Sequence, residues 1–336
     1  MLDSTIVPQN FGANLKMAET YLGMDVGGTK LAVLVGNDRG EVLQKVKRPT
    51  MAQRGPWPII DDLVEMAGEV LEKANLTLND IDAVGVSIGG PLDAAKGIIY
   101  SPPNLPGWDA IPLKNVLSVK LERPVFVEND ANAGALAEWR FGAGRGAQNM
   151  VFLTAGTGMG AGLILDNRLF RGANYLAGEV WKIPLIRKGL DDPNPLEFEY
   201  LTAGPGLARL ARKALQKNPF SKMLEMVGGD LQKITGEIVG KAARLDDPVA
   251  LQVLNEAGTY LGWGLAVLVN VLNPEIFVIG TLGIHLGDLL LGPARRAMRE
   301  TAVPQAAEIV RVVPAQLDAT IGDVAALCVA MEKYEG

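Results

Sequence analysis

A glycine-rich stretch near the amino end of the sequence has residue types that bind phosphate. Residues 23–30, Gly-Met-Asp-Val-Gly-Gly-Thr-Lys, close one apolar run and open another. Apolar runs around a Gly-Gly pair predict a β-hairpin, whose two glycines we expect to turn the chain with positive φ. Consecutive backbone N–H groups there favour an anion, and the aspartate could hold a hydrated Mg²⁺ against phosphate oxygens; the alternative is an ordinary hairpin turn. The predicted cofactor-binding residues are Asp25, Gly27, Gly28, Thr29 and Lys30.

The same pattern occurs a second time in residues 150–167, where a strand, a glycine turn, a strand and a polar tip again follow each other. Three pairs of positions align the two copies: Asp25 with Thr154, Gly27 with Gly156, and Asn37 with Asp166. An internal repeat of this kind indicates two related lobes that each present a phosphate loop to one cleft. The second turn adds four cofactor-binding candidates: Thr154, Gly156, Thr157 and Gly158.

A carboxylate lies between the two turns in the sequence. Apolar spacing predicts a short strand at Val125–Val127 and a helix at Ala133–Phe141, so Asp130 lies at the junction between them. An aspartate at such a junction can cap the helix, or it can accept a proton from a hydroxyl that attacks a phosphoryl group. Position alone leaves both roles open. Asn129 could hydrogen-bond a polyol at the same place.

Other polar or glycine-bearing segments could border the same cleft. Ile81–Ile88 predicts a buried strand that ends near Gly90, and Ile276–Gly283 predicts another. The second ends on Gly280 and Gly283, where an adenosine group could lie against backbone. Asn104 is the polar candidate in a loop with three prolines, although composition alone favours a surface connection that the prolines stiffen. Glu179 stands in a run of small residues and is a candidate ligand for hydroxyls.

The remaining elements are predicted from apolar periodicity. Val42–Val46 is expected to be a third antiparallel strand and Trp181–Arg187 a further strand. The predicted helices cover Pro58–Ala74, Pro248–Leu272 as one or two helices, and Thr320–Lys333.

Composition limits the function classes. A chain of 336 residues fits two domains, and a net charge of −6 offers no basic field for nucleic acid or for an acidic membrane surface. Residues 1–20 do not have the pattern of a secretory signal, and the apolar stretch Leu261–Leu272 is too short to span a bilayer, so we expect a cytoplasmic protein. The one cysteine, Cys328, is expected in the core, and the one histidine, His285, to be structural or solvent-facing.

Six segments together resemble the ROK family (repressor, open reading frame, kinase) of sugar kinases and sugar-responsive regulators. The resemblance covers nearly the whole chain from Tyr21 onward. It is carried by residues 22–30, Gly90-Pro-Leu-Asp93, Ser101-Pro-Pro-Asn-Leu-Pro-Gly-Trp108, Val127-Glu-Asn-Asp-Ala-Asn-Ala133, Thr154-Ala-Gly-Thr-Gly-Met-Gly160 and Ala177-Gly-Glu179.

The resemblance implies an α/β actin-like ATPase fold, with two ribonuclease-H-like lobes around a nucleotide and sugar cleft. Residues 1–20 would be an extension, residues 21–131 with 320–336 a smaller lobe, and residues 132–319 a larger lobe. Asp130 would be the catalytic base, and the two glycine turns would bind the phosphates of Mg-ATP. The implied substrate-binding residues are Gly90, Asn104, Asn129, Glu179 and Glu199. The family's oligomers imply a homodimer or homotetramer.

One segment departs from the family pattern. Family members usually follow Gly-Glu with one residue, Gly-His and a cysteine-rich zinc motif, whereas here Gly178-Glu179 is followed by Val-Trp-Lys. Asp191-Asp-Pro-Asn-Pro195 fills the region of the cysteines, and Glu199 still matches the sugar-binding glutamate after the motif. No structural zinc is therefore expected, because hard carboxylates stand where thiolates and imidazole are needed. Lys182 could donate hydrogen bonds where the histidine does.

These features favour ATP-dependent phosphorylation of a hexose, with glucose at O6 as the implied acceptor. The altered segment keeps open a kinase for an N-acetylhexosamine or fructose, and also a sugar-binding protein without activity. A ROK regulator is a further alternative. About twenty residues precede the first turn, fewer than a three-helix DNA-binding module needs.

Overall fold

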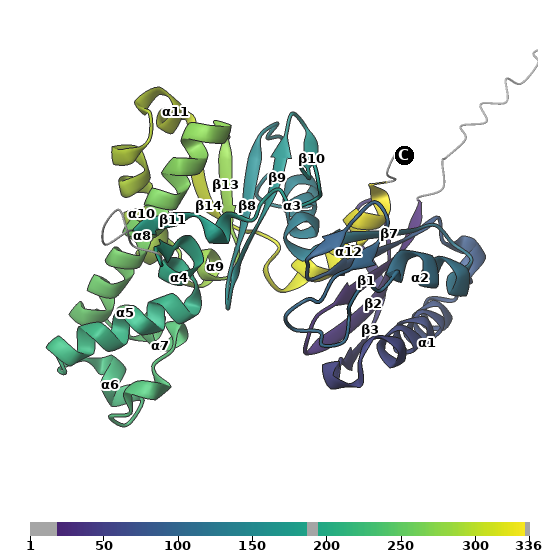
Figure 1. The fold of residues 1–336 in the computed structure, drawn as a ribbon, viewed down its shortest axis with the longest axis horizontal. Helices are drawn as coiled ribbons and strands as arrows, with labels where there is room; N and C mark the ends of the chain where they lie inside the picture. The colour runs from purple at the N-terminus through teal and green to yellow at the C-terminus, as the bar shows by residue number, and fades with distance from the viewer. Residues whose placement is uncertain (1–18, 187–193, 333–336) are drawn as a thin grey trace, which may run out of the picture.

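A computed structural model describes residues 19–186 and 194–332 of the chain. Its main elements are two five-stranded sheets (Figure 1). The first sheet consists of β3 (Val42–Pro49), β2 (Lys30–Asn37), β1 (Thr20–Val26), β4 (Ala83–Ile88) and β7 (Val125–Asn129). The second consists of β10 (Arg168–Phe170), β9 (Met159–Leu165), β8 (Met150–Ala155), β13 (Ile276–Ile279) and β14 (Arg311–Pro314).

The two sheets have the same topology. In each, the central strand pairs antiparallel with the next strand of its hairpin and parallel with a later strand on its other side. The third strand of the hairpin unit is antiparallel and the outermost fifth strand is parallel in both. The internal repeat predicted from the glycine turns is therefore confirmed.

The predicted alignment of the repeat is correct before each turn and wrong by one position after it. In the first hairpin, Val26 pairs with Leu31 across the turn. In the second, Ala155 pairs with Met159, so the second turn is one residue shorter. In the turn that follows each hairpin, Asp166 therefore occupies the position equivalent to Asp38, and not to Asn37 as expected.

Two helices cross between the sheets. α3 (Asp130–Phe141) follows β7 of the first sheet but packs on β8 and β9 of the second. α12 (Ile321–Met331) follows the second sheet but packs on β1 and β4 of the first. The two helices contact each other, and Figure 1 shows both between the sheets. Each lobe therefore contributes a helix to the other, which joins the two lobes along their shared face.

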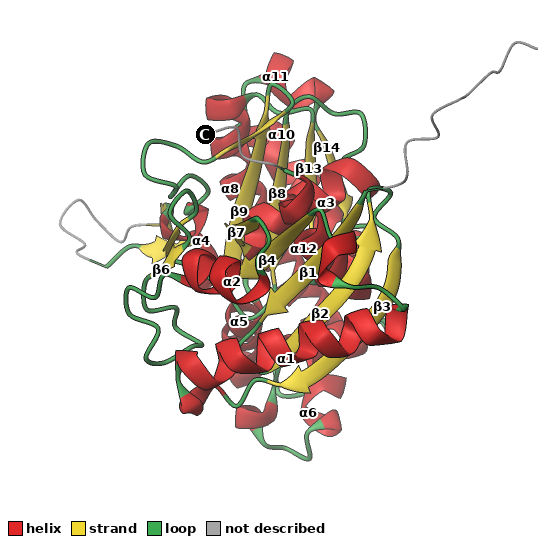
Figure 2. Ribbon diagram, turned by 90° about the vertical axis from the view of Figure 1, so that its right-hand side faces the viewer, coloured by secondary structure: helices red, strands yellow, loops and turns green. Residues whose placement is uncertain are grey.

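The outer face of the first sheet is covered by α1 (Pro56–Ala74) and α2 (Leu113–Leu121), as the turned view shows (Figure 2). Leu22, Met24 and Val26 alternate along β1 into the core under these helices, whereas Tyr21 faces the side of α12. Both faces of the strand are buried, so its sequence is apolar almost throughout.

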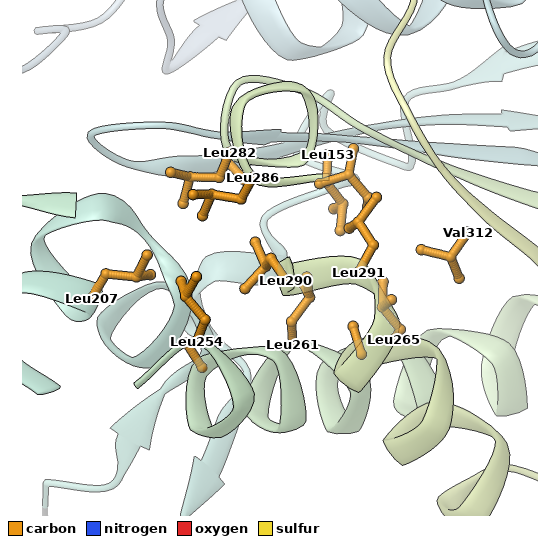
Figure 3. Close-up of a cluster of buried hydrophobic side chains, with 14 of the residues drawn as sticks. Leu153, Leu207, Leu254, Leu261, Leu265, Leu282, Leu286, Leu290, Leu291 and Val312 are labelled. Carbon is orange, nitrogen blue, oxygen red and sulfur yellow. The ribbon is translucent and has the colours of Figure 1, made fainter. Parts of the chain in front are cut away.

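The second sheet carries most of the other helices. Its largest core cluster joins β8 to α8, α9 and α10 through leucines such as Leu153, Leu265 and Leu291 (Figure 3). Asp247 caps α8 by accepting from the N–H of Ala250 at 2.8 Å, and Asn273 ends it in the left-handed conformation. The helices are α4 (Phe198–Thr202), α5 (Gly204–Lys217), α6 (Lys222–Met226), α7 (Gly236–Ala243), α8 (Pro248–Leu272), α9 (Leu282–Leu286), α10 (Asp288–Thr301) and α11 (Pro304–Ile309).

Several predicted boundaries need correction. Pro248–Leu272 is one helix. The predicted strand Trp181–Arg187 is wrong in its first half, where a 3-10 turn covers Val180–Lys182; β11 (Pro184–Ile186) follows and pairs with β12 (Leu196–Glu197). The strand predicted to reach Gly283 ends at Ile279. Arg187, Lys333 and residues 191–193 lie outside the described residues. Two short strands, β5 (Leu92–Asp93) and β6 (Ile98–Ile99), complete the fold.

Two general expectations can be compared with the fold. Cys328 is buried in α12 as predicted, and burial raises the pKa of its thiol to about 12. Over the described ranges, none of the helices combines the length and apolarity that crossing a bilayer requires.

Candidate active site

A cavity of about 230 Å³ opens between the two sheets, where strand ends from both meet the start of α3 and of α12. Four predicted residues line it together: Asp25, Asp130, Thr154 and Gly280. They come from β1, α3, β8 and the end of β13, so segments far apart in the chain converge here. Apolar side chains complete the wall: Phe152, Ile284, Ala315, Ile321 and Ala325.

The structure of the junction at Asp130 shows which residue caps α3, and so bears on whether Asp130 is a cap or a proton acceptor. α3 begins at Asp130, three residues earlier than predicted, and its N-cap is Asn129. The Asn129 side-chain oxygen accepts from the N–H of Ala131 at 2.9 Å, and one Asp130 carboxylate oxygen accepts from the same N–H at 2.9 Å. Because Asn129 caps the helix, Asp130 is not needed as the cap.

The environment of Asp130 suits a proton acceptor. Its side chain is exposed to the cleft, but the surrounding walls desolvate it and raise its pKa; the charge of Glu179 raises the pKa further. The Ala131 N–H opposes this shift. Within residues 19–186 and 194–332, no lysine or arginine forms an ion pair with Asp130.

Asp25 lies at the end of β1 and borders the first turn of α12. Burial raises the pKa of its carboxyl, and the charges of Asp323 and Asp130 raise it further, whereas Lys30 opposes the shift. Gly322 allows this approach, because a Cβ there would lie 2.7 Å from the Asp25 carboxylate. The Asp25 carboxylate is therefore a buried hard oxygen donor, the type of ligand that a divalent cation such as Mg²⁺ prefers.

The first glycine turn differs from its prediction in one respect: neither Gly27 nor Gly28 has positive φ. The N–H of Gly27 donates to the Lys30 carbonyl at 3.1 Å, which closes the turn. A Cβ on Gly28 would lie 2.7 Å from the Cβ of Asn104. The glycine is therefore required by close approach of the proline-rich loop, which brings Asn104 to the turn.

The second turn is held by hydrogen bonds from both sides. The N–H of Gly156 donates to the Gly158 carbonyl at 3.0 Å, and the Thr154 hydroxyl accepts from the N–H of Gly160 at 2.8 Å. Glu199 accepts from the N–H of Met159 at 2.7 Å. Glu199 thus contacts the second turn, whereas the sequence predicted only a contact with the sugar. Thr157 and Gly158 are exposed at the tip.

The other predicted substrate residues lie around the junction of β7 and α3. A Cβ on Gly90 would lie 2.8 Å from the side-chain nitrogen of Asn129, so these two residues are in contact. Glu179 is exposed, acts on the charge of Asp130, and accepts a hydrogen bond from the indole of Trp181. Lys182 pairs with Glu197 at 3.0 Å and lies over the Trp181 ring.

The segment after β13 contains one residue at the cavity and one away from it. Gly280 lines the cavity, whereas Gly283 packs in α9, where a Cβ would lie 2.7 Å from that of Ile279. Between them, Thr281 also lines the cavity and has φ 32° and ψ −82°, a strained conformation for a β-branched residue. Such strain is typical of backbone that a functional site constrains.

Sequence reasoning missed the apolar wall and Gly134, and it also missed Ser87, Thr281, His285, Asp318 and Gly322. Ser87 could have been found, because β4 pairs parallel with β1 and the register places Ser87 beside Asp25. His285 is exposed, in agreement with the solvent-facing alternative of its prediction, and it also borders the cavity. No group of three or more His, Cys, Asp or Glu side chains placed to hold a metal occurs in the described part of the chain.

Comparison with known proteins gives the site its context. A glucokinase from Halalkalibacterium halodurans is 33% identical over 294 residues, which cover 86% of this chain and 88% of the relative. A xylose repressor from Caldicellulosiruptor bescii is 28% identical over 285 residues, covering 84% of this chain and 70% of the repressor. The structure of a ROK family glucokinase from Streptomyces griseus in complex with glucose and AMPPNP is 31% identical, with a TM-score of 0.76 over 93% of this chain and 99% of that chain.

Two sheets of one topology around a polar cavity, together with these relatives, define the class of the protein: it is a sugar kinase with the actin-like ATPase fold. Within that class, the chain belongs to the ROK family, whose pattern matches residues 21–333.

Proposed function

We propose that the protein phosphorylates a hexose at the expense of ATP, with glucose at O6 as the acceptor. The observation that carries the proposal is the Asp130 carboxylate, which lines the cavity together with Asp25 and Thr154, has a raised pKa and is relieved of capping by Asn129. The glucose and AMPPNP complex of the Streptomyces griseus glucokinase supports both the sugar and the nucleotide.

In this mechanism the chain's own residues position the reactants and move one proton. Asp130 accepts the proton of the sugar hydroxyl as the hydroxyl oxygen attacks the γ-phosphorus; the bond from that phosphorus to the β,γ-bridging oxygen breaks, and ADP leaves. In this proposal Gly90, Asn129 and Glu179 hold the sugar from the β7–α3 junction, Asn104 from the side of the first turn and Glu199 from the side of the second. Such positioning supplies much of the rate in phosphoryl transfer, because the attack then becomes effectively unimolecular.

The nucleotide would be bound by backbone donors of the two turns and by the segment at Gly280. At the first turn, Asp25 would hold the Mg²⁺, and Thr29 and Lys30 would bind phosphate oxygens. At the second turn, Thr154 and the exposed Thr157 would bind phosphate. Mg²⁺, when bound, supplies neutralisation of phosphate charge. The Asp25 carboxylate fits this ion, because it is a hard oxygen donor at the cavity whose pKa is raised chiefly by burial, a cost that a bound cation would offset.

A different sugar is the second candidate, and one observation favours it. Where the family places a histidine that touches the sugar, this chain has a 3-10 turn with Trp181 and Lys182, and the lysine is paired with Glu197. An N-acetylhexosamine or fructose would then be the acceptor, with the same base and the same turns.

A regulatory role without catalysis is the third candidate, because the xylose repressor shares the described fold region at 28% identity. Unlike the first two candidates, a regulator needs no phosphorylation of its sugar. A regulator would bind sugar and change its affinity for DNA, whereas a kinase consumes ATP only when its sugar is present.

One experiment separates the three candidates: ADP release with Mg-ATP over glucose, mannose, fructose, N-acetylglucosamine, N-acetylmannosamine and no sugar, after treatment with a zinc chelator. We expect sugar-dependent release, fastest with glucose, that the chelator does not change. Faster release with another sugar would reassign the substrate. Binding of glucose, seen as a raised melting temperature, without turnover on any sugar would contradict the kinase proposal and favour the regulator.

A further inference from the structure

Four charged side chains beside the Asp130 junction form a cluster, and none of them lines the cavity. Glu128 is the last but one residue of β7, Arg140 lies on α3, Arg171 follows β10, and Glu332 follows α12. The cluster therefore joins segments of both sheets and both crossing helices. Its two acidic and two basic groups balance in charge.

The central contact is the pair formed by Glu128 and Arg171. The Arg171 Nε donates to Glu128 Oε2 at 2.7 Å, and the side chains are 16% and 1% exposed. Arg171 also lies 3.7 Å from Glu332, which in turn pairs with Arg140. A charge as buried as that of Glu128 is retained in a folded protein only with such partners.

Glu128 also fixes the segment that presents the base. Its other carboxylate oxygen, Oε1, accepts from the N–H of Asn129 at 2.9 Å and from the side chain of Asn132 at 3.0 Å. These contacts flank Asp130 on both sides in the chain. The orientation of the Asp130 carboxylate is thus coupled to the position of Glu128.

Arg171 connects that segment to the loop that carries Glu179. The Arg171 carbonyl accepts from the N–H of Ala177 at 3.0 Å, which closes the loop over residues 171–177. Glu179 follows this closed loop and raises the pKa of Asp130. One arginine therefore contacts the base-bearing junction of the first sheet through its side chain and a substrate loop of the second sheet through its backbone.

We propose that Arg171 is a positioning residue for phosphoryl transfer: through Glu128 it holds the Asp130 junction and the Glu179 loop in register across the two lobes. The inference rests on the proposed kinase activity. It assigns Arg171 no contact with the sugar or the nucleotide. Its effect is carried by the geometry of Asp130 relative to the bound hydroxyl.

The test compares Arg171→Gln, Arg171→Lys and Glu128→Gln with the wild type, and uses Lys120→Gln as control. Lys120 forms an exposed ion pair with Asp61 at 2.9 Å, and neither residue belongs to the cluster or lines the cavity. We expect Arg171→Gln to lower kcat by about 10²-fold, the effect of misplacing a catalytic group by about 1 Å. Arg171→Lys should recover at least part of this loss, and the control should keep wild-type kinetics.

The pH profile distinguishes positioning from mere stabilisation. If Arg171→Gln lets the Glu179 loop move away, the acid limb of kcat/KM shifts to lower pH, because Glu179 no longer raises the pKa of Asp130. A structural role alone would lower the melting temperature and leave kcat and the pH profile unchanged below it; that result would overturn the inference.

Two further outcomes remain decisive. If Arg171→Gln does not fold, the double variant with Glu128→Gln removes both buried charges, and we expect it to fold but to keep the loss in kcat. Wild-type kcat in the double variant would overturn the inference. A wild type that shows no sugar-dependent turnover would overturn the proposed function and this inference with it, whereas an active wild type with unchanged variants overturns the inference alone.

Discussion

The hairpin of β1 and β2 and the hairpin of β8 and β9 have the same strand topology but different chemistry. Each brings one residue near the end of its first strand, Asp25 or Thr154, to the same cavity. The first has a carboxylate at its strand end, Asp25, and a lysine after its turn, whereas the second has Thr154 at the matching strand position. The strand topology is thus repeated, while the strand residue that each hairpin brings to the cavity is ionisable only in the first lobe.

The reason for glycine also differs between the two turns. Gly28 is forced by Asn104, since a Cβ would lie 2.7 Å from the Asn104 Cβ and 2.8 Å from its carbonyl oxygen. Gly156 meets only ordinary contacts, with its nearest neighbour the Thr281 hydroxyl at 3.5 Å. The first turn is therefore packed against a candidate substrate loop, and the second is open on its corresponding side.

The largest expected effect is that of Asp130→Asn, which removes the base and leaves both turns intact. We expect kcat to fall by about 10²–10⁴-fold with little change in sugar affinity. Sugar-dependent ADP release and calorimetric sugar binding measure the two quantities. Turnover close to that of the wild type would end the assignment of Asp130 as the base.

The same substitution has a stability consequence with a definite sign. The folded-state pKa of Asp130 is raised, so the ionised carboxylate destabilises the fold at pH values above that pKa, and protonation removes the penalty at lower pH. Asp130→Asn should therefore melt at or above the wild-type temperature at neutral pH. The difference should vanish in acid. A clearly lower melting temperature at neutral pH would show that the carboxylate stabilises the fold.

The second prediction sets the strand ends of the two hairpins against each other. Asp25→Asn should lower kcat by about 10²–10³-fold, because it removes a charge that would hold Mg²⁺ and phosphate. Thr154→Val should cost only about 2- to 12-fold, the worth of one neutral hydrogen bond. Both are measured at saturating sugar over a range of Mg²⁺ concentrations. Equal losses in the two variants would contradict the division of charge between the lobes.

The third prediction concerns the two glycines. Gly28→Ala should destabilise the protein by about 1–3 kcal/mol through overpacking and should raise the KM for sugar, because Asn104 must shift. Gly156→Ala, the matched variant, has room for its methyl group and should change neither by much. Thermal denaturation and steady-state kinetics give both values. A larger penalty at Gly156 would reverse the comparison.

The smallest expected effect is a displacement in pH. Glu179→Gln removes a negative charge that raises the pKa of Asp130, so the acid limb of kcat/KM should move to lower pH. The KM for sugar should rise if Glu179 contacts hydroxyls. A profile that does not move, measured beside the wild type in the same buffers, would show that the two carboxylates are not coupled.

The sequence predicts the repeated hairpins and the junction at Asp130 because local patterns encode them. Apolar runs around glycines mark each turn, and an apolar strand followed by a small-residue helix marks the junction. The one-residue difference between the turns was missed, because the glycines of the second turn allow more than one pairing register. Gly28 is needed because its turn packs against Asn104 of another loop, a tertiary contact that spacing does not reveal.

Other parts of the site depend on tertiary placement. His285, Asp318 and Gly322 reach the cavity only because α9 and α12 pack beside β13 and β1. The crossing of α3 and α12 between the sheets likewise has no signal in periodicity, since both helices are apolar on several faces. The lobe boundaries, the oligomeric state and the cytoplasmic location stay predictions.

The most direct test of the proposed chemistry is to identify the product by phosphorus and carbon NMR after incubation of the protein with Mg-ATP and glucose. We expect glucose 6-phosphate and ADP in equal amounts, and neither when glucose or the protein is omitted. ADP without a sugar phosphate, or phosphate on an oxygen other than O6, would contradict transfer from ATP to a hydroxyl held at Asp130.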